Sequence, residues 1–271
     1  LGAYSDAASF EMAEFEPPLL VKQQLQGSDT SNPRDLGALV WNAGVVLARY
    51  LHSQLGQGLR GQRILDLGAG LGICSLAAAQ RGARAVAAEI EPALATLRES
   101  VARNGSPSGV SVVEMPWGEP LKSACPELFG ARDAEPFDLV VGADLLYNPG
   151  LYPLLLPTVL ELLEPGGASS KRPIVYMCYM ERGAEERFFN GAREAGVVCE
   201  PVALEPPLQE LAEELSCVLI RMTRASSPQG SRQLRVQETA WTVTGRGMML
   251  CRAHPNRVRC RSRCWPGGCR N

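Results

Sequence analysis

The chain has 271 residues, of which 45% are hydrophobic and 21% are charged, a balance typical of a globular protein with at least one large core. No apolar run approaches the roughly 20 residues that a membrane-spanning helix needs, so a membrane-embedded protein is excluded. The net charge of −2 combines an acidic body, −11 over residues 1–223, with an arginine-rich tail, +9 over residues 224–271. The acidic body argues against a nucleic-acid-binding protein.

The first clear element along the chain is a helix. Residues 1–18 show no clear pattern, and we assign them to an N-terminal extension. In Ala38–Leu51, apolar side chains recur at helical spacing, which predicts an amphipathic helix. The apolar positions are Leu39, Val40, Ala43, Val46, Leu47, Tyr50 and Leu51.

An apolar strand, with Ile64, Leu65 and Leu67, runs into three glycines at alternate positions and then into a helix-forming run. The glycines are Gly68, Gly70 and Gly72. Glycine lacks Cβ, so a ligand can lie against bare backbone, and open α/β sheets bind ligands at the carboxyl ends of their strands. The spacing differs from the G-x-G-x-x-G of a dinucleotide loop, and the lysine of a P-loop is missing. With Asp66 ahead of the glycines, the segment matches the acidic-x-G-x-G-x-G form of an S-adenosylmethionine loop. A tight turn without a ligand is the alternative.

The second strand, Arg84–Glu89, ends in a carboxylate, and a helix over Pro92–Arg103 follows. A carboxylate in that place can accept hydrogen bonds from both ribose hydroxyls of a nucleoside. Glu89 therefore suits adenosine-containing ligands in general and does not by itself exclude NAD. Alternatively, it caps the next helix, where negative charge is favoured.

Strand and helix signals continue to alternate along the body. With the two strands above, seven strands with interleaved helices predict a Rossmann-like, doubly wound α/β fold with a mostly parallel sheet. No helix is predicted between the last two strands, so we expect a hairpin, and an antiparallel strand, at one edge. The remaining predicted strands are Val110–Met115, Phe137–Gly142, Ile174–Tyr179, Val197–Leu204 and Cys217–Met222, and the remaining helices are Val159–Leu163 and Ala184–Ala195.

The nine cysteines form no regular framework. Those in the body lie in or beside apolar runs, where a free cysteine behaves as a small hydrophobe. The irregular cysteine spacing and the lack of a secretory signal in the sequence as given predict that the protein works in a reducing compartment. We expect the cytoplasm and also the nucleus. Residues 224–271 lack apolar periodicity, which predicts disorder. Their cysteines Cys260, Cys264 and Cys269 are irregularly spaced, so we expect no metal site.

Several of these segments together resemble a known family. The chain is similar to the seven-strand S-adenosylmethionine-dependent methyltransferases and, more narrowly, to the family-16 protein lysine methyltransferases, a group related to those acting on chaperones and elongation factors. The resemblance covers about Leu19 to Arg221 and implies a methyltransferase domain at residues 19–223. Two features depart from the family pattern: Asn42 stands where an acid is common, and the tail has no expected counterpart. The matching segments are Val40–Ala43, Leu65–Gly72, Glu89, Pro116–Gly118 and Gly142–Tyr147, the last resembling the family's D-x-x-Y motif.

The resemblance implies a site for S-adenosylmethionine at the carboxyl ends of the strands. The glycine loop would admit the methionyl part with Asp66 close by, Glu89 would hold the ribose, and Trp117 would lie against the adenine. Trp41 would border the methionine end. Either tryptophan could instead be a plain core residue. The implied cofactor-binding residues are Trp41, Asp66, Gly68, Ala69, Gly70, Gly72, Glu89, Trp117 and Ala143.

Asp144 and Tyr147 follow the fourth strand, again at a carboxyl strand end. A lysine ammonium, with a reference pKa of about 10.4, must lose its proton before its nitrogen can attack a methyl group in line. Asp144 could orient the amine, and Tyr147 could present its ring or hydroxyl to the departing proton and the methylated cation. Alternatively, Asp144 caps a turn and Tyr147 only packs.

The sequence therefore predicts an S-adenosylmethionine-dependent protein-lysine N-methyltransferase. Its partner would be a protein with an accessible lysine, such as a chaperone or an elongation factor. We expect it to bind neither a membrane nor nucleic acid. The acidic body suggests that the target lysine has basic neighbours. Two alternatives stay open: a small-molecule or protein N-terminal N-methyltransferase on the same fold, and a catalytically silent partner-binding protein.

Overall fold

The computed structural model describes residues 7–24, 36–130, 135–165 and 171–225. The predictions for the tail, its disorder and its lack of a metal site, fall on residues that lie almost entirely outside these ranges. Within the described ranges, none of the helices has the length and apolar composition that crossing a membrane demands.

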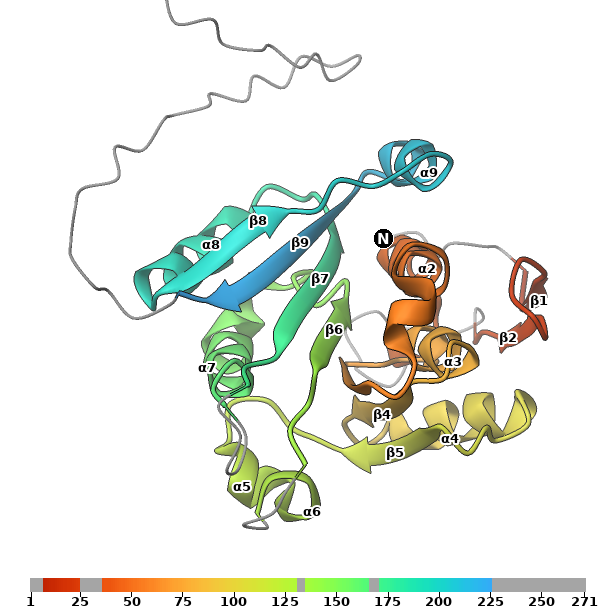
Figure 1. Ribbon diagram of the computed structural model, residues 1–271, viewed down its shortest axis with the longest axis horizontal. Coiled ribbons are helices and arrows are strands. Elements are labelled where there is room, and N and C mark those ends of the chain that lie inside the picture. Colours follow the sequence, from red (N-terminus) through yellow and green to blue (C-terminus); the bar gives the residue numbers. More distant parts are fainter. Residues whose placement is uncertain (1–6, 25–35, 131–134, 166–170, 226–271) are drawn as a thin grey trace, which may run out of the picture. The chain divides into compact units, whose positions relative to one another are not determined.

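A seven-stranded sheet forms the centre of the fold (Figure 1), in the order β5-β4-β3-β6-β7-β9-β8. Strands β3 to β7 run parallel to one another, whereas β9 is antiparallel to both β7 and β8. This arrangement confirms the predicted mostly parallel, Rossmann-like sheet with antiparallel pairing at one edge. The strands are β3 (Arg63–Leu67), β4 (Arg84–Glu89), β5 (Val110–Glu114), β6 (Leu139–Ala143), β7 (Ile174–Met180), β8 (Val197–Pro201) and β9 (Cys217–Arg224).

Helices cover both faces of this sheet. One face packs against α2 (Asn42–Arg49), α3 (Ile73–Gln80), α4 (Leu94–Arg103) and α9 (Leu208–Glu214). The other face packs against α7 (Tyr152–Leu162) and α8 (Glu185–Glu194), with short α5 (Leu121–Ala124) and α6 (Pro126–Phe129) near its end. Short connecting turns are η1 (Tyr50–Leu55, π-helical), η2 (Gly56–Leu59) and η3 (Pro149–Leu151).

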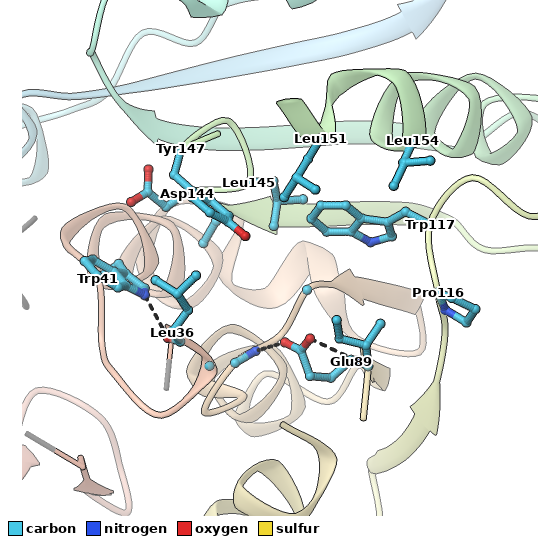
Figure 2. Close-up of a pocket in the computed structure, with 15 residues that line it drawn as sticks. Leu36, Trp41, Glu89, Pro116, Trp117, Asp144, Leu145, Tyr147, Leu151 and Leu154 are labelled. Atoms are coloured by element: carbon cyan, nitrogen blue, oxygen red, sulfur yellow. Dashed lines mark hydrogen bonds between the residues drawn. The ribbon is translucent and has the colours of Figure 1, made fainter. Parts of the chain in front are cut away.

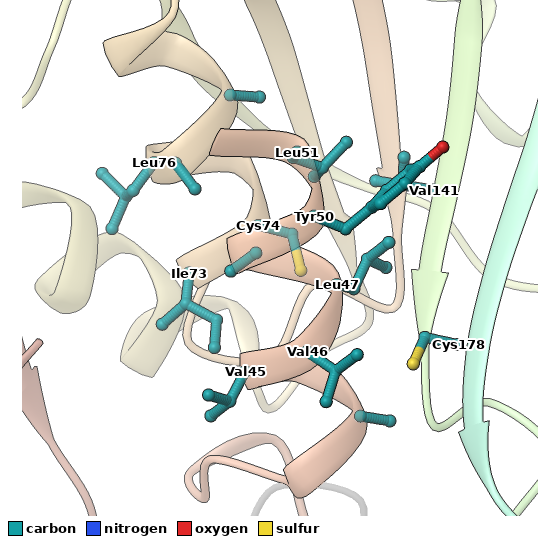
Figure 3. Packing of buried hydrophobic residues seen from close by; sticks show 14 of the residues in the cluster. Val45, Val46, Leu47, Tyr50, Leu51, Ile73, Cys74, Leu76, Val141 and Cys178 are labelled. Atoms are coloured by element: carbon teal, nitrogen blue, oxygen red, sulfur yellow. The ribbon is translucent and has the colours of Figure 1, made fainter. Parts of the chain in front are cut away.

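The core divides between the two faces because successive strand residues point to opposite sides of a sheet. On β3, Ile64 belongs to the cluster under α2 and α3, while Leu65 and Leu67 belong to the cluster under α7 and α8. Figure 3 shows α2, α3, β6 and β7 contributing side chains to the first cluster. Strands covered on both faces are near-continuous apolar runs, which explains why their position was readable in the sequence.

The N-terminal part of the chain contains a hairpin that the sequence did not reveal. Strand β1 (Ser9–Met12) pairs with β2 (Leu19–Lys22) in an antiparallel two-stranded sheet. Met12 and Phe15 are buried in the cluster under α2. Residues assigned to an extension are thus paired and packed here, while the division of the chain into domains stays a prediction.

Several expected elements differ in the structure. The helix expected over Ala38–Leu51 begins at Asn42, and its last residues belong to η1. The prediction of no helix between the last two strands is wrong, because α9 lies there and packs on α2. Its apolar residues Leu208, Leu211 and Ala212 recur at helical spacing, but the run is short and acidic. The helix expected at Val159–Leu163, entered through Pro153 or Pro157, runs over Tyr152–Leu162. Pro153 lies in its first turn, where a proline is tolerated, and Pro157 lies inside the helix. The strand expected over Val197–Leu204 ends at Pro201.

Candidate active site

A cavity of about 320 Å³ lies at the carboxyl ends of β3, β4 and β6. Figure 2 shows that its wall combines the glycine loop with the ends of neighbouring strands and with α7. A smaller space of about 40 Å³ adjoins it and shares Trp41, Gly68, Gly70 and Ala143 with it. Of the residues predicted for the site, the larger cavity is lined by Trp41, Gly68, Gly70, Glu89, Trp117, Ala143, Asp144 and Tyr147, and the smaller one adds Asp66 and Ala69.

The glycine loop exposes backbone at the cavity. Gly68 and Gly70 have φ values of 63° and 55°, in the left-handed region that side chains disfavour. A Cβ at Gly68 would lie 2.7 Å from Leu145 Cδ2 and 3.2 Å from Trp117 Cζ2. A side chain there would therefore push into the cavity wall, and glycine keeps the space open.

Gly72, also predicted for the site, lines neither cavity. It precedes α3 with φ 73°, and a Cβ there would lie 2.7 Å from Leu97 Cδ1 of α4. The structure thus gives this glycine a packing role between helices at the end of the loop.

Glu89 closes β4 with its carboxylate on the cavity. Its two oxygens accept hydrogen bonds from the backbone nitrogens of Gly70 and Ile90, each at 2.9 Å. Burial raises the pKa of Glu89, and these two hydrogen bonds oppose the shift. A carboxylate has about four acceptor positions, so lone pairs remain for hydroxyl donors of a ligand. Helix α4 has no side-chain cap, which leaves the capping alternative without support.

Asp66 is buried beneath the glycine loop with 1% of its surface exposed. It accepts hydrogen bonds from the Ser75 hydroxyl at 2.7 Å and the Ser75 backbone nitrogen at 3.0 Å. Burial raises the pKa of Asp66 to about 7, although the bonds from Ser75 lower it. This carboxylate ties the end of β3 to the start of α3, and it reaches only the smaller space.

The segment before α2 lies over the glycine loop. Trp41 donates from its indole nitrogen to the Leu36 carbonyl oxygen at 3.1 Å. A Cβ on Gly37 would meet Ala93 Cβ at 2.8 Å, and one on Gly70 would meet the Gly37 oxygen at 3.5 Å. Sequence reasoning missed Leu36 and Gly37 as lining residues, because the only signal was one glycine ahead of a predicted helix.

Trp117 gives the cavity a flat apolar wall. Its ring is half-buried and lies near Leu145, Leu151 and Leu154, as Figure 2 shows. The next residue is held in place because the Gly118 nitrogen donates to the Thr158 hydroxyl of α7 at 2.9 Å. Trp117 is therefore only partly a core residue, with a face available for a ring-shaped ligand.

Asp144 follows β6 in a left-handed conformation, with φ 56° and 5% of its surface exposed. Its two oxygens accept bonds from both terminal nitrogens of Arg182, each at 2.7 Å. The Met180 nitrogen adds a bond at 3.3 Å, and the Asp144 nitrogen donates to the Cys178 oxygen at 2.7 Å. Several hydrogen bonds to one residue can hold an unusual backbone conformation, as is often seen at functional sites. The number of these bonds argues against the alternative that Asp144 only caps a turn.

Sequence reasoning missed Arg182. It is 38 residues away from Asp144 in the chain, and a single arginine at the end of a strand is common. The available signal was its place directly after β7, which neighbours the strand that carries Asp144.

Tyr147 points into the cavity from the loop after β6 (Figure 2), and its side chain is half-buried. Among the described residues its hydroxyl has no hydrogen-bond partner. Burial raises the pKa of Tyr147, and the Glu89 and Asp144 carboxylates raise it further. The side chain thus presents a neutral phenol with a free hydroxyl to the cavity.

In the part of the chain that the structure describes, no three metal-ligating side chains lie together where they could hold a metal ion. The described cysteines, Cys74, Cys125, Cys178, Cys199 and Cys217, are free thiols.

Comparison with known proteins finds one matching family and several protein methyltransferases. The family described as "Lysine methyltransferase" matches residues 21–195. The zebrafish (Danio rerio) protein N-lysine methyltransferase METTL21A is 33% identical over 163 residues, which cover 59% of this chain and 68% of that protein. The mouse (Mus musculus) EEF1A lysine methyltransferase 3 is 33% identical over 133 residues, or 49% of this chain and 53% of that protein. The Xenopus laevis histone-arginine methyltransferase METTL23 is 34% identical over 131 residues, 47% and 52% of the two chains.

The fold and the matched residues define the class of protein. The matched region spans more than half of the chain and contains the glycine loop, Glu89, Trp117, Asp144 and Tyr147. The chain belongs to the lysine methyltransferase family. It is an enzyme of the protein-lysine methyltransferase type, as its sequence predicted.

Proposed function

We propose that this chain binds S-adenosylmethionine in the cavity beside the glycine loop and methylates a lysine side chain of a protein. The observation that carries the proposal is that one cavity contains three features. These are the Glu89 carboxylate, suited to the ribose of a nucleoside, the exposed backbone of the glycine loop, and the side chains of Asp144 and Tyr147. The cofactor, when bound, supplies an electrophilic methyl group on a sulfonium sulfur. The protein's own contribution is therefore positioning and control of charge.

The lining residues fit the parts of this cofactor. Glu89 has acceptor positions left for ribose hydroxyls, and Trp117 and Pro116 offer apolar surface for a flat base. Gly68 and Gly70 leave bare backbone at the loop, and the smaller space beside Trp41 and Ala143 adds room for the amino-acid end. These features support S-adenosylmethionine as the ligand. Asp66 also lines the smaller space, so it would lie close to the amino-acid end of the cofactor.

The opposite end of the cavity suits an amine acceptor. Asp144 and Tyr147 offer acidic and phenolic oxygens there, while the walls are largely apolar. A buried apolar site disfavours an ammonium and favours the neutral amine that attacks. The Tyr147 ring would attract the cation formed on methylation. The residues proposed to bind the amine acceptor, Asp144 and Tyr147, thus both follow β6.

For the substrate, we propose a protein whose target lysine has basic neighbours. The body carries a charge of −11 over residues 1–223, which attracts basic segments. Similarity to the mouse EEF1A lysine methyltransferase 3 supports an elongation factor as the substrate; a chaperone is the other class that the sequence resemblance implied. The described cysteines are free thiols, which supports a location in a reducing compartment, the cytoplasm or the nucleus.

The test is to label the proteins of a cell lysate. The full chain and S-adenosylmethionine carrying an isotopic methyl group are added to lysate, and the modified residues are mapped by mass spectrometry. We expect the label on the side-chain nitrogen of a lysine in one or a few proteins, and no label without the chain. Label on small molecules or on N-terminal amines alone would contradict the proposal.

A further inference from the structure

One side chain, that of Arg182, binds both oxygens of Asp144. The two parallel bonds are each 2.7 Å long, and only 4% of the Asp144 side chain and 22% of the Arg182 side chain are exposed. A forked, two-bond contact of this kind is specific to arginine and fixes the plane of the carboxylate. Asp144 lines the cavity together with Tyr147, and Arg182 contacts Asp144 from outside the set of lining residues.

The turn between β7 and α8 aims the Arg182 side chain. The backbone nitrogens of Arg182 and Gly183 donate to the Glu185 carboxylate at 2.7 and 2.8 Å, and Arg182 also donates to the Met180 carbonyl oxygen at 3.2 Å. Glu185 is itself 5% exposed. Glu185 thus fixes the backbone of the turn, and the guanidinium itself contacts Asp144 and the Met180 carbonyl oxygen. Its contact with Asp144 is therefore a built feature of the site.

A lone carboxylate beside an attacking lysine would create an electrostatic problem. An opposite charge within about 4–6 Å favours the charged form of an ionisable group, with shifts of about 1–3 pKa units. An unpaired Asp144 would therefore raise the pKa of the lysine and keep it as the unreactive ammonium. Pairing with a guanidinium cancels most of that field, while lone pairs on the carboxylate oxygens can still accept a bond from the amine.

We propose that Arg182 is a positioning residue that neutralises Asp144, so that this carboxylate orients the lysine amine without stabilising its ammonium form. The inference rests on the proposed function, because it needs a lysine acceptor at this end of the cavity.

The other ionisable groups around the pair leave this balance intact. Tyr147 faces Asp144 from the β6 loop, and burial raises the pKa of its phenol, which stays neutral. Cys178 on β7 and Cys217 on β9 are buried thiols, and burial raises the pKa of Cys178. Glu185 acts on Arg182 through the turn of α8, and Glu89 reaches Tyr147 from β4. Arg182 is thus the cation that directly contacts Asp144.

The experiment measures single-turnover methyl transfer against pH at saturating cofactor and peptide. The peptide carries the lysine mapped in the labelling experiment. Rates in the bound complex report pKa values of the complex rather than of free substrate. For the wild type we expect the midpoint of the rise in rate at or below the free-lysine value of about 10.4. For Arg182→Gln we expect the midpoint to rise by about one unit or more, which corresponds to a loss of about tenfold at neutral pH that shrinks in alkaline solution.

Two further variants separate charge from structure. Arg182→Lys keeps the charge without the fork, so its midpoint stays at the wild-type value while its rate falls at every pH. Arg193→Gln removes an arginine from an exposed ion pair with Glu186 on α8 and leaves the profile unchanged. Thermal melting and cofactor affinity of each variant show whether the fold is intact.

A pH-independent loss in Arg182→Gln, with the wild-type midpoint, would overturn the inference. A wild-type midpoint above that of free lysine, or a shifted midpoint in Arg182→Lys, would also overturn the inference. These two measurements test the inference if Arg182→Gln does not fold. A wild type that methylates no protein lysine would instead overturn the proposed function itself.

Discussion

At the scale of single residues, three carboxylates at strand ends have different environments and hence different tasks. Asp66 is buried under the loop and bonded to Ser75, so it holds the loop to α3. Glu89 keeps acceptor positions on the cavity. Asp144 is locked to Arg182. The residue type is similar in all three places, and burial and hydrogen-bond partners decide what each does.

Replacing Glu89 tests its assignment to the cofactor. Glu89→Gln keeps the shape but removes the charge that strengthens hydrogen bonds from hydroxyls, a contribution of about 1.5–3 kcal/mol. We expect the dissociation constant of S-adenosylmethionine, measured by calorimetry, to rise about 10- to 100-fold. The exposed neighbour Glu91 is the control, since Glu91→Gln should bind as the wild type does. Equal affinity in both variants would contradict the assignment.

Replacing Asp144 tests its assignment to the acceptor. Its side-chain contacts are to Arg182 and Met180, outside the glycine loop and Glu89. We therefore expect Asp144→Ala to lower methyl transfer by about 100-fold or more, with cofactor affinity close to that of the wild type. Transfer of labelled methyl groups and calorimetry measure the two quantities. Unchanged turnover would remove Asp144 from the reaction.

At the scale of elements, the strand-to-helix turn after β3 forms a wall of the cavity. The strand predicted from Ile64, Leu65 and Leu67 is observed as β3, because a buried apolar run that ends in glycines has few other solutions. What the pattern left open was the role of each glycine. Gly68 faces the cavity wall and Gly72 faces α4, since successive turn residues point in different directions.

Adding one methyl group at Gly68 tests this turn. Both Gly68 and Gly61 have positive φ, 63° and 73°, but a Cβ at Gly61 would meet nothing within 4 Å. Gly61→Ala should therefore show only the backbone strain, about 1 kcal/mol. Gly68→Ala adds the clash with Leu145, so we expect a larger loss of stability in thermal melting and weaker cofactor binding. Equal effects in the two variants would show that the wall at Leu145 yields to the added methyl group.

At the scale of the whole molecule, the β1–β2 hairpin joins the N-terminal segment to the core of the domain. Leu20 exchanges backbone bonds with the Asn104 side chain at 2.8 and 3.0 Å, and Phe15 is 1% exposed in the cluster under α2. The contact between Leu20 and Asn104 links residues 84 positions apart along the chain, a distance at which no periodic pattern operates.

A pair of substitutions in this hairpin measures its contribution to stability. Phe15→Ala removes a fully buried ring and should lower the free energy of unfolding by about 3–5 kcal/mol. Leu20→Ala, on the outward face with 38% exposure, should change it by less than about 1 kcal/mol. Chemical denaturation measures both. Similar values for the two would mean that the N-terminal segment contributes little to the fold.

The sequence by itself determined the order and type of the sheet elements, and it singled out the residues that line most of the cavity. Those features depend on local patterns: apolar runs, glycine spacing and a carboxylate at a strand end. It missed the β1–β2 hairpin, α9, Leu36, Gly37 and Arg182, whose placement follows from contacts between distant segments. Only the tertiary structure paired Asp144 with Arg182 and turned Gly72 toward α4, because parallel strands bring separate loops to one edge of the sheet.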